Sequence, residues 1–242
     1  MATRVFEPQE LATEAEVSLG ERNQQHLVRV LRMTPGDTFV IFNGDGAEYG
    51  AQLVSTGKRE AIARIGAWRK PAVESPLTTH LGQVLSKGDR MEYAIQKAVE
   101  LGVTTITLLT STRCEIRLDN ERQDKKLHHL QNVAIHAAEQ SGRVHVPALR
   151  GPMPLADWVA EVDAKLKLVL HPGAGTSALP ANCTTAALLV GPEGGLTEEE
   201  VGTAARWGFS PATIGPRVLR TETAPAVALA VLQSRYGDFA GI

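Results

Sequence analysis

The chain has few cysteines and few aromatic residues. Only Cys114 and Cys183 occur among its 242 residues, and no CxxC or paired Cys/His spacing accompanies them. This usage excludes a disulfide framework and gives no metal site, so we expect both thiols to be buried as small hydrophobic groups in a reducing compartment. Aromatic residues make up 5% of the chain. That excludes a single-strand binder built on many base-stacking side chains.

Long hydrophobic runs and a strong net charge are also missing. The longest apolar runs, Ala186–Val190 and Ala224–Leu232, fall short of the roughly 20 residues that cross a bilayer. The first residues lack the apolar core and cleavage site of a secretory signal, so we expect a cytoplasmic protein without a membrane span. Net charge is −2 and the pI about 6.4, so any contact with RNA must be local.

What the chain does have is ordinary globular composition, 43% hydrophobic and 21% charged, which is enough for a core. Its length suits one large domain or two modest ones, and we expect two. The stretch Lys70–Pro76 holds two prolines and no periodicity, as short linkers do. The sequence therefore predicts one domain over residues 1–72 and another over 73–242.

The first domain resembles a small β-barrel. Turn residues separate the strand-like runs Thr38–Phe42, Tyr49–Val54 and Ala61–Ala67. Apolar spacing predicts a single helix over Glu21–Met33.

The second domain alternates strand-like runs with helical segments, a pattern typical of a parallel α/β sheet. The expected strands are Leu77–Leu85, Thr104–Thr110, Leu166–Leu170, Ala186–Val190 and Ala212–Gly215. The expected helices are Asp89–Leu101, Asp119–Ser141, one from Thr197 that stops before Gly208, and Glu222–Tyr236. The third of these begins with a capping box, in which Thr197 caps and Glu200 lies three residues later.

Three loops that follow expected strands carry the candidate chemistry. Gly191–Gly195 joins a strand to a capped helix, which is a ligand-binding geometry but neither a P-loop nor GxGxxG. Arg220–Thr223 packs more polar groups into one connection than capping requires. His171 follows a third strand, where a lone histidine more often has a structural role than a catalytic one. Loops at the carboxyl ends of parallel strands meet, so the three can form one pocket.

Two motifs identify the chain as similar to a known family. The sequence Gly-Pro-Glu-Gly-Gly at 191–195, with Gly-Pro-Arg-Val-Leu-Arg-Thr-Glu-Thr-Ala at 215–224, closely resembles the signature of RsmE-type bacterial 16S rRNA uridine-N3 methyltransferases. The resemblance extends through His26–Arg32, Gly36-Asp37, Glu92, Gln96–Ala98, Glu100–Gly102 and Glu139–Arg143.

This resemblance implies a PUA-like RNA-binding barrel, then a SPOUT domain whose carboxy-terminal segment forms a trefoil knot. It also implies a homodimer that methylates 16S rRNA in the small ribosomal subunit, and S-adenosylmethionine bound in a bent form in the knot. The residues it places at the cofactor are Leu170, His171, Gly191, Pro192, Glu193, Gly194, Gly195, Ile214, Gly215, Val218, Leu219, Arg220 and Thr223.

Methylation of N3 requires removal of its proton, and Glu222 and Glu193 are the candidate general bases, with Arg220 orienting the base or a phosphate. The Glu193 carboxylate can equally well accept local backbone amides. For RNA capture we expect Arg22, His26, Arg29 and Arg32, although a solvated surface stripe has the same pattern. The sequence does not place Lys87, Arg90, Lys97, Arg113 and Arg143 on one surface.

Two other functions fit the same sequence. One is a non-catalytic RNA-binding factor for ribosome assembly that keeps the barrel and has lost the cofactor. The other is a SPOUT methyltransferase with a different RNA target. Cofactor binding separates the first from our reading, and the identity of the modified nucleoside separates the second.

Overall fold

The computed structural model describes residues 2–57, 60–114, 120–174 and 179–239, and these form two compact units. The N-terminal unit comprises the chain up to Glu74 together with Ala138–Val146. The C-terminal unit comprises Ser75–Ala137 and the chain from Pro147 onward. No pattern in the sequence indicates that residues 138–146, which follow the linker by some distance, belong to the N-terminal unit. The assignment of function to domains 1–72 and 73–242 stays a prediction.

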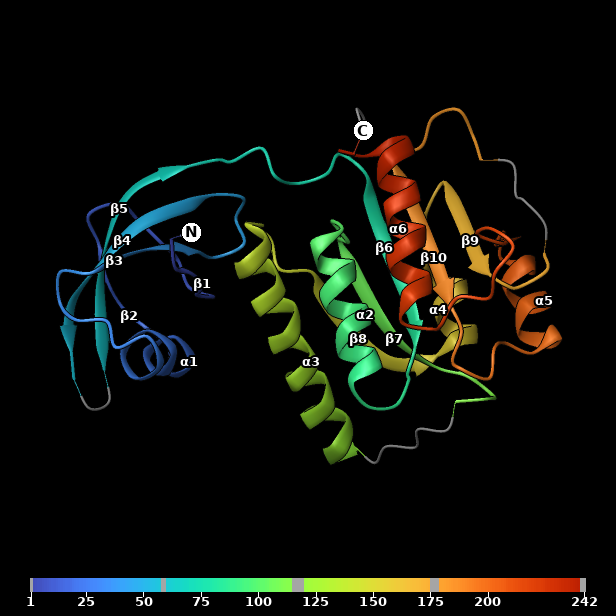
Figure 1. The fold of residues 1–242 in the computed structure, drawn as a ribbon, viewed down its shortest axis with the longest axis horizontal. Coiled ribbons are helices and arrows are strands. Elements are labelled where there is room, and N and C mark those ends of the chain that lie inside the picture. The colour runs from blue at the N-terminus through green and yellow to red at the C-terminus, as the bar shows by residue number, and fades with distance from the viewer. Residues whose placement is uncertain (1, 58–59, 115–119, 175–178, 240–242) are drawn as a thin grey trace. The chain divides into compact units, whose positions relative to one another are not determined.

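A curved five-stranded sheet forms the N-terminal unit (Figure 1). Its order is β1 (Arg4–Phe6), β3 (Thr38–Phe42), β4 (Glu48–Thr56), β5 (Ala61–Arg69) and β2 (Glu16–Ser18). Neighbouring strands are antiparallel except for β1 and β3. The sheet encloses a core that includes Val5, Leu27, Ile41, Leu53 and Ile65, all buried. The three expected strands are confirmed, whereas β1 and β2, with three residues each, are too short to show a period.

The helix expected over Glu21–Met33 is wrong in type and length. One α-helical turn, α1 (Glu21–Gln24), passes into a π-helix, η1 (Gln25–Val30). The Leu31 amide donates to the carbonyl of His26, five residues earlier, at 2.9 Å, and Arg32 has a left-handed φ of 55°. Apolar spacing alone cannot distinguish a π-helix from an α-helix here, because either helix would bury Leu27.

The C-terminal unit contains the expected parallel sheet, with six strands in the order β11-β9-β10-β6-β7-β8. The strands are β6 (Thr78–Val84), β7 (Thr105–Thr110), β8 (Ala148–Pro154), β9 (Leu166–Leu170), β10 (Thr185–Val190) and β11 (Ser210–Ala212). The last expected strand, Ala212–Gly215, was wrong at both bounds, because β11 begins at Ser210 and stops at Ala212, and residues 213–215 belong to a loop. None of the residues of β8 is buried, and the strand contains Gly151, Pro152 and Pro154, which explains why the sequence did not indicate it. The trefoil knot stays a prediction.

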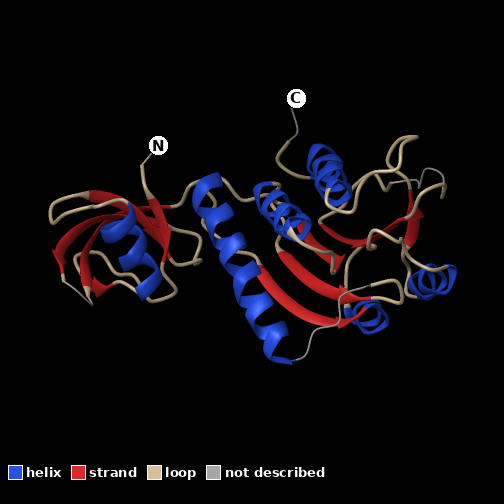
Figure 2. Cartoon of the chain, turned by 60° about the horizontal axis from the view of Figure 1, so that its bottom comes forward, coloured by secondary structure: helices blue, strands red, loops and turns tan. Residues whose placement is uncertain are grey.

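Helices cover both faces of this sheet (Figure 2). The helices are α2 (Asp89–Glu100), α3 (Asn120–Ser141), α4 (Leu155–Glu161), α5 (Glu198–Arg206) and α6 (Thr223–Tyr236). α2 packs beside α6, while α4 packs beside α5 on the opposite face. The capping box of α5 is confirmed, with Thr197 and Glu200 bonded reciprocally. Only the seven-residue α4 was not expected.

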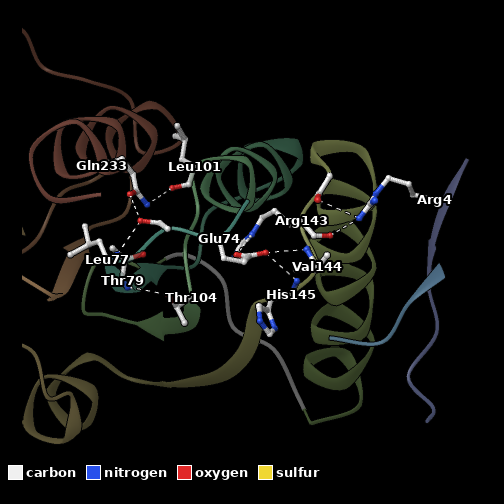
Figure 3. Close-up of polar contacts among 12 residues, drawn as sticks. Arg4, Glu74, Leu77, Thr79, Leu101, Thr104, Arg143, Val144, His145 and Gln233 are labelled. Atoms are coloured by element: carbon white, nitrogen blue, oxygen red, sulfur yellow. Dashed lines mark hydrogen bonds and ion pairs between the residues drawn. The ribbon is translucent and has the colours of Figure 1, made fainter. Parts of the chain in front are cut away.

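The linker residues are fixed by hydrogen bonds, each to its own unit (Figure 3). In the N-terminal unit, the Glu74 carboxylate accepts from the Arg143 guanidinium at 2.7 Å and from the Val144 amide at 3.0 Å. In the C-terminal unit, the Ser75 hydroxyl donates to the side-chain oxygen of Gln233 at 2.6 Å, and the Gln233 amide donates to the Leu101 carbonyl at 2.9 Å. The stretch Lys70–Pro76 has no helix or strand, as expected of a linker.

Both cysteines are free, but only one is as buried as expected. Cys183 is buried, whereas Cys114 is partly exposed. None of the helices in the described part of the chain is long and apolar enough to cross a membrane.

Candidate functional site

Three loops at one edge of the C-terminal sheet surround a cavity. Strands β9, β10 and β11 are parallel and adjacent, so their carboxyl ends meet at this edge. The loops begin at His171, Gly191 and Thr213, and together they enclose about 600 Å³. The polar loops singled out in the sequence therefore do come together, at the edge where open α/β sheets bind ligands.

Most of the expected cofactor residues line this cavity. They are Leu170, His171, Gly191, Pro192, Glu193, Gly195, Ile214, Gly215, Val218, Leu219 and Arg220. Gly194 and Thr223 do not line it: the Gly194 carbonyl accepts from the Arg113 side chain at 2.9 Å, and Thr223 is the first residue of α6. Arg90, Thr213, Arg217 and Thr221 also line the cavity, although they were not among the expected cofactor residues. Of these, Arg217 and Thr221 lie inside the second motif, so their place in it was the available signal.

The glycines of the first motif serve two purposes. Gly195 has φ 69°, and its amide donates to the Pro192 carbonyl at 2.9 Å to close a tight turn. At Gly191, a Cβ atom would lie 2.9 Å from Cγ of Leu196, so a side chain does not fit there. Glycine is therefore required at 191 by the close packing of Leu196.

Glu193 is engaged in local interactions. Its carboxylate accepts from the Arg90 guanidinium at 2.8 Å. Burial raises the pKa of Glu193, but hydrogen bonds from its own backbone amide, from Arg90 and from the Lys87 backbone, with the charge of Arg90, lower it overall. This geometry favours the second interpretation given above, in which the carboxylate holds the turn and is a poor proton acceptor.

Arg220 and Glu222 occupy the loop before α6. The Arg220 carbonyl accepts from the amides of Thr223 and Ala224, both at 2.9 Å, and its side chain is exposed. Glu222 is the N-cap residue of α6, yet its side chain makes no cap hydrogen bond and lines the cavity instead. Glu222 is thus the carboxylate better placed to meet a reacting group.

The remaining basic residues are divided between the two units. Arg90 lines the cavity and Arg113 bonds to the glycine-rich loop, so both border the site. Lys97 pairs with Glu100 at 2.8 Å on α2, and Arg143 lies in the N-terminal unit.

The four residues expected to capture RNA separate into two groups in the N-terminal unit. Arg22 donates to the Glu139 carboxylate at 2.6 Å and to the Phe6 carbonyl at 2.9 Å, so its guanidinium is part of the structure of the unit. Arg29 and Arg32 are exposed, and His26 is half-buried. Val30 and Leu31, which lie between the two arginines, are 68% and 42% exposed.

No metal centre accompanies these groups in the described ranges, where no three His, Cys, Asp or Glu side chains are placed to hold an ion. What the cavity offers instead is bare glycine backbone, apolar walls and one available carboxylate. That arrangement suits a bound organic cofactor and a proton transfer.

Comparison with known proteins gives the same picture. Residues 73–233 match the model of an RNA methyltransferase domain, and residues 19–66 match that of an RNA methyltransferase PUA domain. The ribosomal RNA small subunit methyltransferase E of Buchnera aphidicola is 35% identical, over 92% of each chain. The protein of the same name from Bacillus subtilis is 32% identical, over 86% of this chain and 85% of the relative.

Two solved structures are similar over almost the full length. A methyltransferase from Legionella pneumophila in complex with its cofactor SAM has a TM-score of 0.94 and 41% identity, covering 98% of this chain and 99% of that one. A ribosomal RNA small subunit methyltransferase E from Neisseria gonorrhoeae, bound to S-adenosyl methionine, has a TM-score of 0.92 and 35% identity, covering 99% of this chain and 100% of that one. The chain therefore belongs to the RNA methyltransferase family that includes the ribosomal RNA small subunit methyltransferases E.

Proposed function

We propose that this protein transfers the methyl group of S-adenosylmethionine to N3 of a uridine in 16S rRNA. The observation that carries the proposal is the cavity at the carboxyl ends of β9, β10 and β11, which is lined by both signature motifs. Family membership supports the reaction class, and the relatives' names support the ribosomal RNA of the small subunit as substrate.

The residues of the cavity fit such a cofactor. A volume of about 600 Å³ is within the range of ligand sites. Bare backbone at Gly195 permits close approach, and Leu170, Ile214 and Leu219 supply apolar walls. When bound, the cofactor supplies a methyl group on a positively charged sulfur. A bent cofactor held in a knotted segment is part of this proposal.

The chain's own residues align the uridine and accept its proton. N3 must attack the methyl carbon opposite the sulfur, so positioning supplies much of the rate. Glu222 receives the N3 proton as general base, and Arg220, exposed at the same loop, orients the base or a phosphate. Glu193 holds the glycine-rich turn through Arg90 and acts as a positioning residue.

RNA capture is assigned to the exposed end of η1 in the N-terminal unit. Arg29 and Arg32 present two guanidinium groups to solvent, while Val30 and Leu31 add apolar surface between them. Guanidinium groups pair with phosphates, and exposed apolar groups contact unstacked bases. His26 is a secondary contact, and Arg22 serves the structure of the unit.

A homodimer is the form in which we expect the enzyme to work. Between Ala224 and Leu232, helix α6 is apolar on all sides, and its outer positions Ala226, Val227, Ala230 and Val231 are only partly covered. An apolar, small-residue helix face that stays open in one chain is suited to a second copy. The site of action is the cytoplasm, where the small subunit assembles.

The proposal is tested by incubating the protein with methyl-labelled S-adenosylmethionine and with small ribosomal subunits that lack the modification. The rRNA is then digested and the labelled nucleoside is identified by mass spectrometry. We expect 3-methyluridine. A different labelled nucleoside would keep the reaction class and refute the target, and a protein that does not bind the cofactor by calorimetry would be the non-catalytic RNA-binding factor.

A further inference from the structure

The loop from Thr213 to Glu222 lines the cofactor cavity along its length, and hydrogen bonds hold it at its two ends. At the first end, the Thr213 hydroxyl donates to the His171 carbonyl at 2.9 Å and accepts from the Ala174 amide at 3.0 Å. Thr213 thereby attaches the start of this loop to the loop that follows β9.

Thr221 performs the same task at the second end. Its hydroxyl donates to the Gly191 carbonyl at 2.7 Å and accepts from the side-chain amide of Gln83 at 3.2 Å. Because the Gln83 N–H occupies a lone pair of the hydroxyl, the hydroxyl proton is directed to Gly191. Both side chains are buried, with Thr221 8% and Gln83 1% exposed.

The middle of the loop depends on these two ends. Within the described chain, residues 214–219 make no hydrogen bond to another segment. Gly215, Pro216, Arg217 and Val218 are exposed, and Val218 is 79% exposed. The position of the cavity wall formed by Ile214 and Leu219 is therefore set by Thr213 and Thr221.

We propose that Thr213 and Thr221 are positioning residues for cofactor binding, and that Gln83 orients Thr221 through its hydrogen bond to the hydroxyl. The inference rests on the proposed function, because it takes the ligand of this cavity to be S-adenosylmethionine. Both hydroxyls bond to backbone carbonyls of other loops, so they preorganise the cavity without contributing to the chemistry. Loss of either anchor leaves a looser wall and a weaker site.

Isosteric substitutions test this directly. Thr213→Val and Thr221→Val remove the hydroxyl and keep the shape, whereas Thr213→Ser and Thr221→Ser keep the hydroxyl. Thr185→Val is the matched control, because the Thr185 hydroxyl accepts from the Lys165 amide at 2.9 Å at the amino end of β10. Dissociation constants for S-adenosylmethionine are measured by calorimetry, and melting temperatures are recorded for all variants.

Each valine variant loses both hydrogen bonds of the hydroxyl, and we expect it to weaken cofactor binding about tenfold. For the serine variants and Thr185→Val, the dissociation constant for S-adenosylmethionine should stay within about twofold of that of the unchanged protein. The effect should appear in KM for the cofactor, with kcat retained at saturation. Valine variants that bind as the unchanged protein does would overturn the proposal, and so would serine variants that bind as weakly as the valine ones.

Limited trypsin digestion gives a readout that needs no cofactor. Arg217 and Arg220 are exposed cleavage sites in the middle and near the end of the loop. We expect faster cleavage there in both valine variants and in Gln83→Leu than in Thr185→Val. Unchanged cleavage would count against the anchoring role. If the unchanged protein does not bind S-adenosylmethionine, the proposed function fails while faster cleavage still supports the anchors.

Discussion

The indole Nε1 of Trp158 donates a hydrogen bond to Nε2 of His80 at 3.2 Å, and the two rings meet edge to face at 82°. The same nitrogen lies 2.8 Å from the Thr107 hydroxyl. A proton on this nitrogen would face the indole N–H. The contact therefore requires a neutral imidazole between the sheet and α4.

Stability should fall in mild acid because of this pair. Burial, with a smaller effect of the Arg150 charge, lowers the pKa of His80 from 6.5 to about 4. The unfolded chain binds a proton between these values and the folded one does not, so stability decreases as pH falls from 6.5 to 4, by about 3 kcal/mol in total. Urea unfolding across this range measures the decrease. His80→Gln should flatten that part of the profile, and an equally steep profile in this variant would assign the effect to other groups.

Gly82→Ala should destabilise the C-terminal unit. A Cβ at Gly82 would lie 2.6 Å from the Trp158 ring, which is itself buried. Overpacking of this kind costs about 2 kcal/mol or more. Gly202→Ala is the control, because Gly202 lies inside α5 with no atom near its Cβ position, and there alanine should add about 0.5–1 kcal/mol. Thermal unfolding of both variants should show shifts of opposite sign.

The two candidate bases should differ in their response to amide substitution. Glu222→Gln should lower kcat about 100-fold or more and leave cofactor affinity unchanged, as expected of a proton acceptor. Glu193→Gln should keep kcat within a few-fold, because the lowered pKa of Glu193 makes it a weak base and its role is to hold the turn. Single-turnover methylation with calorimetry of the cofactor separates the two outcomes. Full activity of Glu222→Gln would end its assignment as base.

RNA affinity should depend on Arg29 and Arg32 and not directly on Arg22. Arg29→Ala and Arg32→Asn, the latter chosen because asparagine tolerates a left-handed φ, should weaken binding and reduce the salt slope by about 0.7–0.9 for each lost phosphate contact. Arg22→Ala should instead lower the melting temperature, because the buried Glu139 loses a charged partner. Filter binding over a salt series, with a melting curve for each variant, makes the comparison. An unchanged salt slope in Arg29→Ala would show that this arginine does not contact RNA phosphates and belongs to a solvated surface stripe.

The open face of α6 should control the oligomeric state. Val231 is 44% exposed on that face, so Val231→Glu should convert a dimer to a monomer by adding a charge at the interface. Trp207→Glu places the same charge on another exposed apolar side chain, 49% exposed after α5, and should not change the mass. Light scattering after gel filtration reads the mass directly. An unchanged dimer in Val231→Glu would place the interface elsewhere.

Local patterns in the sequence determined much of the C-terminal unit. β9 has its expected bounds and β10 begins one residue early, because a buried parallel strand is a short apolar run. The capping box of α5 was readable because Thr197 and Glu200 interact three residues apart. The meeting of the three loops followed from the rule that parallel strands end at one edge.

Only the tertiary structure decided the contacts that join distant residues. Arg22 meets Glu139, 117 positions away, and this ion pair engages its guanidinium within the N-terminal unit. The Thr221 hydroxyl meets Gly191, 30 positions away, and Gln83, 138 positions away. The sequence determined which loops carry polar groups, because caps and strand periods are local. The structure decided which of those groups are already hydrogen-bonded within the protein. A buried polar group needs a hydrogen-bond partner, but that partner can lie anywhere along the chain.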